Sequence, residues 1–238
     1  LYTDAVLKLG YLADIDKKSE IEYSLIDPSG KAVSKNTFPL NPTAGSINEI
    51  PGKNPLKWDA EHPVSYKLIV SVKQNGAEVS QFEQSIGFRD IKVTANRLLV
   101  TGYPVQLRGE CRHDIHPSLG RKTTAELASL DVILFKKSNM NFVRTSHYPP
   151  SEKFIEYCDK FGIYVECETA VCFVDTYRQK NYAPGNTQSS ADYKNRYLSQ
   201  YQEMVNSFRS HSSIIMWSIG NESVYGDNFQ LCYDWSKA

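Results

Sequence analysis

A short apolar segment that ends in an amide and a carboxyl group is the strongest chemical signal in the sequence. Residues 214–220 contain one polar side chain, and Asn221 and Glu222 follow directly. Such a run is typical of a strand buried on both faces of a parallel sheet. In α/β barrels these strands end at the rim that carries the catalytic groups. The segment predicts a catalytic carboxyl group at Glu222, with Asn221 beside it on the substrate. The alternative is that both residues only cap the next turn.

Polar side chains also follow three earlier predicted strands. The clusters are Arg112, His113, Asp114 and His116; Arg144, Ser146, His147 and Tyr148; and Glu168. Because the carboxyl ends of parallel strands meet at one rim, these groups can meet although they are far apart in sequence. Structural roles are the alternatives: an ion pair for Glu168, and ordinary hydrogen bonding for His147. Glu166, inside the third strand, is expected to pair with Arg144 or Arg112.

Other chemistries have less support in the sequence. His113 and His116 are spaced for a metal site or a metal-dependent hydrolase with His147, but no motif sets a third ligand. Phosphate-binding glycine loops and GxSxG elbows are absent. Lys plus Arg equals Asp plus Glu, so no basic excess indicates nucleic-acid binding. No apolar run reaches the ~18 residues of a membrane span. Five cysteines without a CxxC pair favour free thiols, with those at positions 158, 167 and 172 buried.

The hydrophobic period divides the chain into two halves. Residues 1–88 alternate with a period of two, and Asn75-Gly76 between two alternating runs predicts a hairpin. A small antiparallel β-sandwich of immunoglobulin type is the natural interpretation. In residues 89–238, short strands come to alternate with helices, which implies a parallel sheet with right-handed crossovers. The predicted fold class is therefore a β-sandwich followed by an α/β domain.

Helices are predicted between the strands of the second half. Thr123 and Glu126 form a capping box for the first, Ser151 and Gly162 bound the second, and Asp192 begins the third after a polar loop over residues 174–191. Their expected inward faces include Leu127, Leu130, Leu134, Phe154, Cys158, Phe161, Tyr193, Tyr197, Tyr201, Met204 and Phe208. About four strand–helix units result. Since an eight-stranded barrel needs about 250 residues, we expect a partial TIM barrel from a longer chain.

Four ordered segments of the second half resemble glycoside hydrolase family 2, most closely its β-galactosidase branch. The segments are residues 107–117, 143–149, 158–165 and 214–223, and the first contains Arg112-His113-Asp114-Ile115-His116-Pro117. Residues 87–89 resemble the family's passage from an immunoglobulin-like domain into the barrel. The resemblance implies a retaining β-glycosidase that acts on terminal β-galactosides. In such enzymes two carboxyl groups about 5 Å apart flank the glycosidic bond.

The resemblance also implies a role for each site residue. Glu222 falls on the family's acid/base, and Asn221 on the residue that hydrogen-bonds the sugar's 2-hydroxyl. The other substrate-binding positions fall on His113, His147, Arg112 and Arg144. The family nucleophile is a Glu on a later strand. It is therefore expected beyond this chain, and residues 1–238 alone are expected to be inactive.

Departures from the family pattern bear on ligands. The Glu and His that bind magnesium in some β-galactosidases fall on Cys172 and Val174, which are not magnesium ligands, so no metal or other cofactor is expected. Gly109-Glu110-Cys111 replaces the usual Gly-Val-Asn, which leaves the sugar open. The expected partners are a carbohydrate and the missing sandwich and barrel segments of the parent chain. Nucleic acid and a membrane span are not expected, and a homo-oligomer is left open. The rival hypothesis is a non-catalytic carbohydrate-binding or assembly module on a degenerate barrel.

Overall fold

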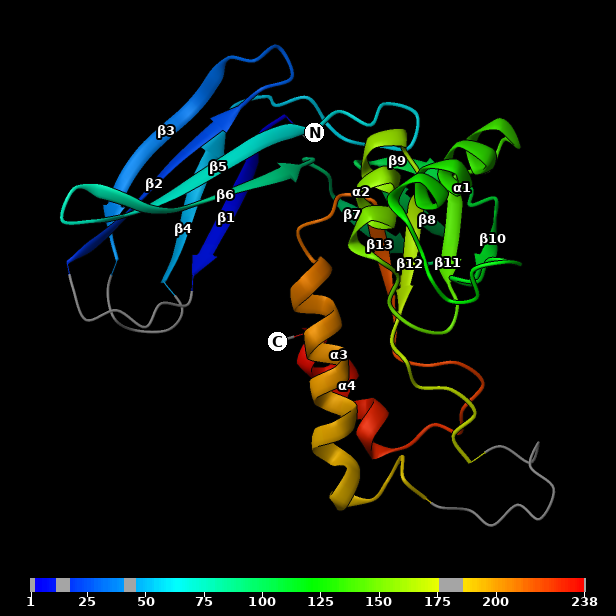
Figure 1. The fold of residues 1–238 in the computed structure, drawn as a ribbon. Helices are drawn as coiled ribbons and strands as arrows, with labels where there is room; N and C mark the ends of the chain where they lie inside the picture. The colour runs from blue at the N-terminus through cyan, green and yellow to red at the C-terminus, as the bar shows by residue number, and fades with distance from the viewer. Residues whose placement is uncertain (1–2, 12–17, 41–45, 176–185, 238) are drawn as a thin grey trace. The chain divides into compact units, whose positions relative to one another are not determined.

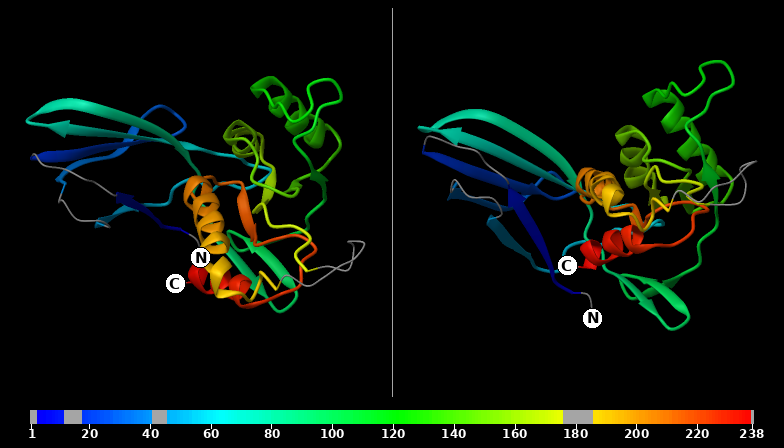
Figure 2. Two further views of the ribbon diagram at one scale, coloured as in Figure 1. Left: turned by 60° about the horizontal axis from the view of Figure 1, so that its bottom comes forward. Right: turned by 90° about the horizontal axis from the view of Figure 1, so that it is seen from below.

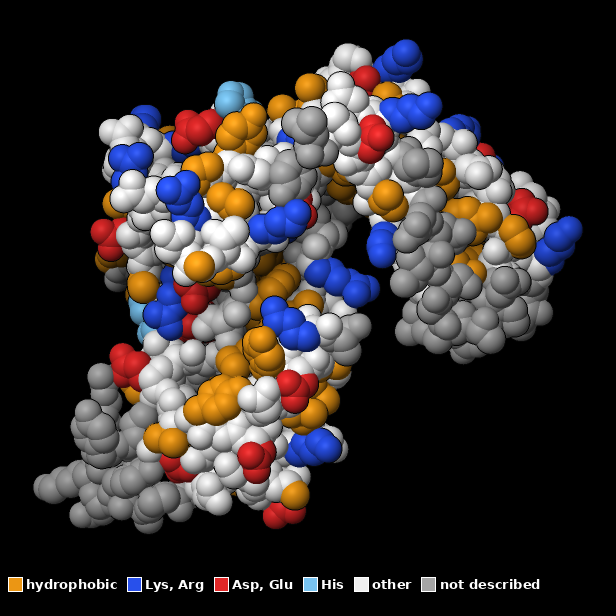
Figure 3. Space-filling model, turned by 180° about the vertical axis from the view of Figure 1, so that it is seen from behind, with side chains coloured by type: hydrophobic (Ala, Val, Ile, Leu, Met, Phe, Trp, Pro, Cys, Tyr) orange, Lys and Arg blue, Asp and Glu red, His pale blue; other side chains and the backbone are white. Residues whose placement is uncertain are grey.

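The chain folds as two units, residues 1–106 and 107–238 (Figure 1). The computed structural model describes residues 3–11, 18–40, 46–175 and 186–237. Within these residues, no helix is both long and apolar enough to cross a membrane. On the face drawn in Figure 3, Lys and Arg side chains are interspersed with Asp and Glu, as the zero net charge of the sequence leads one to expect.

Antiparallel sheets make up the first unit. The four-stranded sheet has the order β3-β2-β5-β6, and β1 pairs with β4. A third sheet has the order β7-β8-β9. The strands are β1 Ala5–Tyr11, β2 Ser19–Ile26, β3 Ala32–Pro39, β4 Ser46–Gly52, β5 Tyr66–Gln74, β6 Ala77–Ile86, β7 Ile91–Thr94, β8 Arg97–Val100 and β9 Tyr103–Val105.

A shared core joins two of these sheets into the predicted sandwich. Alternate side chains of β2, including Tyr23 and Leu25, pack with Leu68 of β5 and Ile50 of β4. The predicted hairpin at Asn75-Gly76 is confirmed, because β5 and β6 pair up to Gln74 and Ala77. Asn75 and Gly76 have φ angles of 51° and 83°, as a two-residue hairpin turn of this type requires.

In the part of the second unit that the structure describes, a parallel sheet is accompanied by four α-helices (Figure 1). The sheet order β10-β11-β12-β13 follows the chain, as in a barrel. The elements are β10 Gly109–Arg112, α1 Ala125–Lys137, β11 Phe142–Thr145, α2 Glu152–Phe161, β12 Tyr164–Glu168, α3 Lys194–Phe208, β13 Ile214–Ser218 and α4 Asp227–Lys237. These four strand–helix units confirm the predicted partial TIM barrel.

The hydrophobic core of this unit lies between the sheet and its helices. Val143, Val165 and Ile214 reach it from the strands, and Ala128, Phe154 and other side chains reach it from the helices. Helices α3 and α4 lie side by side in both views of Figure 2, with rings of Tyr197 and Phe229 packed edge to face at 5.2 Å. Because strand side chains alternate, the strand residues between the core positions face away from the helices.

The helix boundaries agree with the sequence better than the helix faces do. Ser151 caps α2 and Gly162 ends it in the left-handed conformation, as predicted. The cap of α1 is Thr124, not Thr123, and the predicted Asp192 start of α3 is replaced by a 3-10 turn at 191–193. Leu130 and Leu134 are half exposed, so the predicted face of α1 is wrong. The inward positions of α1 are Ala128 and Val132, and those of α3 are Tyr197, Tyr201, Met204 and Phe208. Part of the predicted loop 174–191 lies outside the described residues.

Gly109 allows β10 to pair with β11, and this gives a test of the sheet. A Cβ atom at Gly109 would lie 1.8 Å from the backbone oxygen of Phe142. We expect Gly109→Ala to push β10 off the sheet and destabilise the unit by about 3 kcal/mol, the upper end for overpacking. Urea unfolding would measure the change. Gly52→Ala is the control, because its Cβ would meet atoms no nearer than 3.6 Å. Equal midpoints for both variants would contradict the prediction.

Candidate functional site

The carboxyl ends of β11, β12 and β13 bring five predicted or neighbouring polar residues into one cluster. Register places Arg144 opposite Glu166, and Glu168 opposite Ser218, on the sheet face away from the core. His147 follows β11 by two residues, and Asn221 follows β13 by three. The hydrogen bonds among them join positions as far as 77 residues apart in sequence. We call Arg144, His147, Glu168, Ser218 and Asn221 the rim cluster.

Glu168 lies at the centre of the rim cluster and is fully buried. Its Oε2 accepts hydrogen bonds from Arg144 Nε at 2.9 Å, from Arg144 Nη2, and from Ser218 Oγ at 2.6 Å. Its Oε1 lies 2.6 Å from His147 Nδ1. A buried carboxylate is stable only when it is paired and hydrogen-bonded in this way. Burial opposes the charge on Arg144, but the hydrogen bond and charge of Glu168 outweigh it and raise the pKa of Arg144.

Asn221 is buried, and both ends of its amide are engaged. Its Oδ1 accepts from Arg144 Nη2 at 2.9 Å, and its Nδ2 donates to Cys172 Sγ at 3.2 Å. Its backbone is held as well, since its N–H donates to Val171 and its carbonyl accepts from Phe173. The segment after β13 is therefore fixed against the segment after β12 up to Asn221.

Glu222 leaves this fixed segment with an exposed side chain. Its φ angle is 39°, in the left-handed region that a residue with a Cβ rarely adopts. Strain of this kind costs roughly 1–3 kcal/mol and gathers at functional sites. The following Ser223 holds the turn, because its Oγ donates to the Asn221 carbonyl at 2.8 Å and accepts from the Val174 amide at 3.1 Å. The loop thus holds Glu222 in a strained, solvent-exposed turn directly after Asn221.

His113 reaches the rim cluster from the end of β10. Its exposed ring packs edge to face on His147, with 5.2 Å between the centroids. Tyr148 supports the loop that carries His113, because the Tyr148 hydroxyl accepts a hydrogen bond from the Asp114 amide at 2.9 Å. The two predicted histidines therefore lie together, and His147 is the one that contacts Glu168.

Arg112 is not brought to the rim cluster. Register pairs Arg112 with Thr145 and places Cys111, not Arg112, opposite Arg144. The Arg112 guanidinium turns to the helices, where Nε lies 2.8 Å from Asp131 of α1 and the group stacks 4.0 Å from the ring centre of Phe154 of α2. It also pairs with Asp114 in the following loop. Arg112 thus joins the end of β10 to the helix layer.

Glu166 pairs with Arg144, one of the two partners that the sequence allowed. Its Oε1 lies 4.0 Å from Arg144 Nε. Burial raises the pKa of Glu166, while the Arg144 charge opposes that rise. Glu168 also has the ion pair that was its structural alternative, with Arg144 as the partner.

Sequence reasoning missed two members of the site region. Ser218 was the one polar side chain in an apolar strand, and this was a usable signal, because its hydroxyl donates to Glu168. Cys172 was predicted to be buried, but it is half-buried and contacts Asn221 through its thiol. Cys158 and Cys167 are buried as predicted, and burial raises the pKa of Cys167 to about 12. All five cysteines are free thiols, as predicted.

The spacing of His113 and His116 in the sequence had left a metal site open. Within the described residues, no group of three or more His, Cys, Asp or Glu side chains is placed to hold a metal ion. His116 lies in its own turn, where Nδ1 accepts from the Ser118 amide at 3.2 Å.

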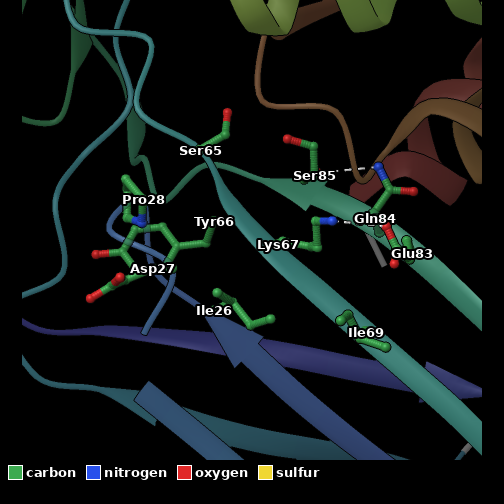
Figure 4. Close-up of a pocket in the computed structure, with 11 residues that line it drawn as sticks. Ile26, Asp27, Pro28, Ser65, Tyr66, Lys67, Ile69, Glu83, Gln84 and Ser85 are labelled. Atoms are coloured by element: carbon green, nitrogen blue, oxygen red, sulfur yellow. Dashed lines mark hydrogen bonds and ion pairs between the residues drawn. The ribbon is translucent and has the colours of Figure 1, made fainter. Parts of the chain in front are cut away.

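A shallow concavity of about 640 Å³ lies on the first unit, lined by β2, β5, β6 and the turn after β2 (Figure 4). Its carboxyl groups are already engaged. Asp27 accepts from the Ser29 hydroxyl at 2.6 Å, which lowers the Asp27 pKa, and Glu83 pairs with Lys67 at 3.1 Å. Asp27 stabilises the turn after β2, and Glu83 forms an ion pair between β6 and β5. We therefore assign the concavity no catalytic role.

Comparison with known proteins gives two family models that match in order. The model for glycosyl hydrolases family 2 matches residues 4–89, and the model for the TIM barrel domain of that family matches residues 91–238. A β-galactosidase of Vibrio vulnificus is 38% identical over 186 residues, 78% of this chain and 18% of that protein. A β-galactosidase of Vibrio cholerae is 28% identical over all of this chain and 24% of that protein. The chain thus spans about a fifth of the length of these relatives.

Solved structures share the fold. A β-glucuronidase of Parabacteroides merdae has a TM-score of 0.81 at 24% identity, over 95% of this chain and 28% of that one. A β-glycosidase of Bacteroides vulgatus has a TM-score of 0.82 at 23% identity, over 99% of this chain and 30% of that one. At this identity the likeness establishes the sandwich and partial barrel alone. The barrel model, however, covers more than half of the 238 residues, and it confirms the resemblance seen in the sequence. The chain therefore belongs to glycoside hydrolase family 2.

Proposed function

We propose that the complete protein is a retaining β-glycosidase that hydrolyses terminal β-galactosides. The observation that carries the proposal is the end of β13, where Asn221 is fixed in the rim cluster and the next residue, Glu222, is exposed in a strained turn. Family membership supports a glycosidase, and the β-galactosidase relatives support the sugar. We also propose that the sandwich domain spans residues 1–88 and the barrel domain residues 89–238; the ranges of the two family models support this division.

In this proposal the reaction proceeds in two steps. Glu222 donates its proton to the glycosidic oxygen as the bond to the anomeric carbon breaks, while a second carboxylate bonds to that carbon. Glu222 then takes a proton from water, whose oxygen displaces the second carboxylate and completes the hydrolysis with retained configuration. We propose that the second carboxylate comes from a part of the protein outside residues 1–238, since these residues match only 18% of the length of the β-galactosidase of Vibrio vulnificus.

The rim cluster supplies the remaining contacts. Asn221 hydrogen-bonds the sugar's 2-hydroxyl, and His113 and His147 contact the sugar and stabilise the transition state. Arg144 supports Asn221 through the hydrogen bond to its side-chain oxygen. We assign Arg112 a supporting role in the loop that carries His113, because it is bound to Asp131 and Asp114.

The test is a panel of aryl β-glycosides assayed with the complete protein. We expect the largest kcat/KM for the β-galactoside, and a product that is released as the β-anomer before it mutarotates. Proton NMR of the fresh product would show the anomer. Hydrolysis of the β-glucuronide in preference to the β-galactoside would replace the proposed sugar and keep the mechanism. Sugar binding without turnover would instead support the non-catalytic module.

A further inference from the structure

We infer that Glu168 is a positioning residue, which acts on the bound sugar through Arg144 and Asn221. The inference deepens the proposed function and rests on it. Glu168 is fully buried, whereas Glu222 is exposed, so the two carboxyl groups of this rim have different surroundings.

The carboxylate of Glu168 is already saturated with donors. Oε2 receives two nitrogens of Arg144 and the hydroxyl of Ser218, and Oε1 is in contact with His147 Nδ1. Because the side chain is also fully buried, its oxygens do not reach a substrate, and an ionised carboxylate has no proton to give. Its effect on a reaction must therefore pass through the groups that it holds.

The first of these groups is Arg144, which determines how the Asn221 amide points. Arg144 Nη2 donates both to Glu168 and to Asn221 Oδ1. A guanidinium nitrogen only donates, so the end of the Asn221 amide that faces it must be the oxygen. The amide NH2 is consequently turned to the other side, where one hydrogen is given to Cys172 Sγ and the second remains for a ligand hydroxyl. Glu168 thus sets the direction of the donor that the proposed function uses.

The second group is His147, whose tautomer Glu168 sets. An ionised carboxylate only accepts, so His147 Nδ1, 2.6 Å away, must carry a hydrogen. In the neutral imidazole this leaves Nε2 as an acceptor. One buried carboxylate therefore specifies the hydrogen-bond character of both neighbours.

Glu168→Gln is the informative substitution in the complete protein. A glutamine of the same shape removes the negative charge that holds Arg144 and offers a single accepting oxygen. If that oxygen faces Arg144, the NH2 group faces His147 Nδ1, which must then give up its hydrogen; if the ends are reversed, Arg144 loses its acceptor. The readout is the ratio of kcat/KM for an aryl β-galactoside to that for its 2-deoxy analogue. We expect this ratio to fall about tenfold or more, because the lost hydrogen bond strengthens in the transition state. The ratio is unaffected by the fraction of protein that folds.

Matched variants distinguish the loss of the positioning effect from a non-specific loss of activity. Glu156→Gln makes the same chemical change on the solvent side of α2, where Glu156 pairs with Lys153 and not with the rim cluster, and should leave the ratio unchanged. Asn221→Ala should lower the ratio, and Glu168→Gln combined with Asn221→Ala should lower it no further than Asn221→Ala alone. Arg144→Lys keeps the charge but loses the two-nitrogen contact, and should lower the ratio as Glu168→Gln does.

The outcomes distinguish this inference from the proposed function. If Asn221→Ala lowers the ratio and Glu168→Gln does not, the positioning role is wrong and the glycosidase remains. If the unaltered protein hydrolyses no glycoside, the proposed function is wrong. A crystal structure of the Glu168→Gln protein then still tests the arrangement: Arg144 displaced from Asn221 supports the inference, and an unchanged Arg144–Asn221 contact overturns it.

Discussion

Glu222→Gln in the complete protein should lower turnover of β-galactosides with poor leaving groups by about 10²–10⁴, the usual contribution of one general acid. Glutamine keeps the size of the side chain but has no proton to transfer. An activated aryl galactoside, whose phenolate leaves without protonation, should lose far less in the first step. The strained turn at Glu222 should persist, since glutamine carries the same Cβ. The loss should therefore depend on the leaving group.

The measurement is kcat/KM across phenols of decreasing acidity for both proteins. Glu156→Gln is a suitable control, because Glu156 is exposed on α2 and pairs with Lys153 at 2.7 Å. Azide gives a second readout, since it attacks the glycosyl-enzyme as an anion without the help of a general base. It should raise turnover of the Glu222→Gln protein on activated substrates and yield the β-glycosyl azide. Full activity on a poor leaving group would refute the assignment of Glu222.

Local patterns in the sequence were enough to predict the fold class. Asn75-Gly76 predicted its hairpin because the turn conformation depends on those two residues alone. The alternation of strands and helices after Gly109 predicted a parallel sheet because that order leaves few other topologies. The resemblance to the family rested on four ordered segments, which the barrel model then confirmed over residues 91–238.

The orientation of single side chains depended on contacts that the sequence does not display. Arg112 and Arg144 look alike at the ends of their strands, but register places them on opposite faces, and a shift of one residue reverses a face. Helix α1 carries two apolar stripes, and the one with Ala128 and Val132, not that with Leu130, packs on the core. The hydrogen bonds of Glu168 reach partners 21 to 50 residues away, which no local period encodes.

Asp159→Ala should lower the stability of the segment that leads into β13 by about 3–5 kcal/mol, because two buried donors lose their acceptor at a cost of about 1–3 kcal/mol each. Asp159 of α2 is buried, and its Oδ2 lies 2.6 Å from Nδ1 of buried His211. Its Oδ1 accepts from the Ser213 amide at 2.7 Å. Alanine would remove both acceptors at once. Because β13 ends at the loop that carries Asn221 and Glu222, the change acts on the strand that positions the proposed acid/base.

Hydrogen exchange of peptides from residues 209–218 would measure this loosening in the complete protein. A loss of 3–5 kcal/mol corresponds to exchange of the Ser213 amide that is about 10² to 4 × 10³ times faster, since each 1.4 kcal/mol is tenfold. Asp159→Asn keeps a carbonyl oxygen for one of the two contacts and should give a smaller change. Glu156→Ala, three residues away on the exposed side of α2, should change exchange little, because exposed ion pairs contribute about 0–1 kcal/mol. Exchange as slow in Asp159→Ala as in the unaltered protein would mean that core packing around Ile214, and not the buried pair, holds β13 in place.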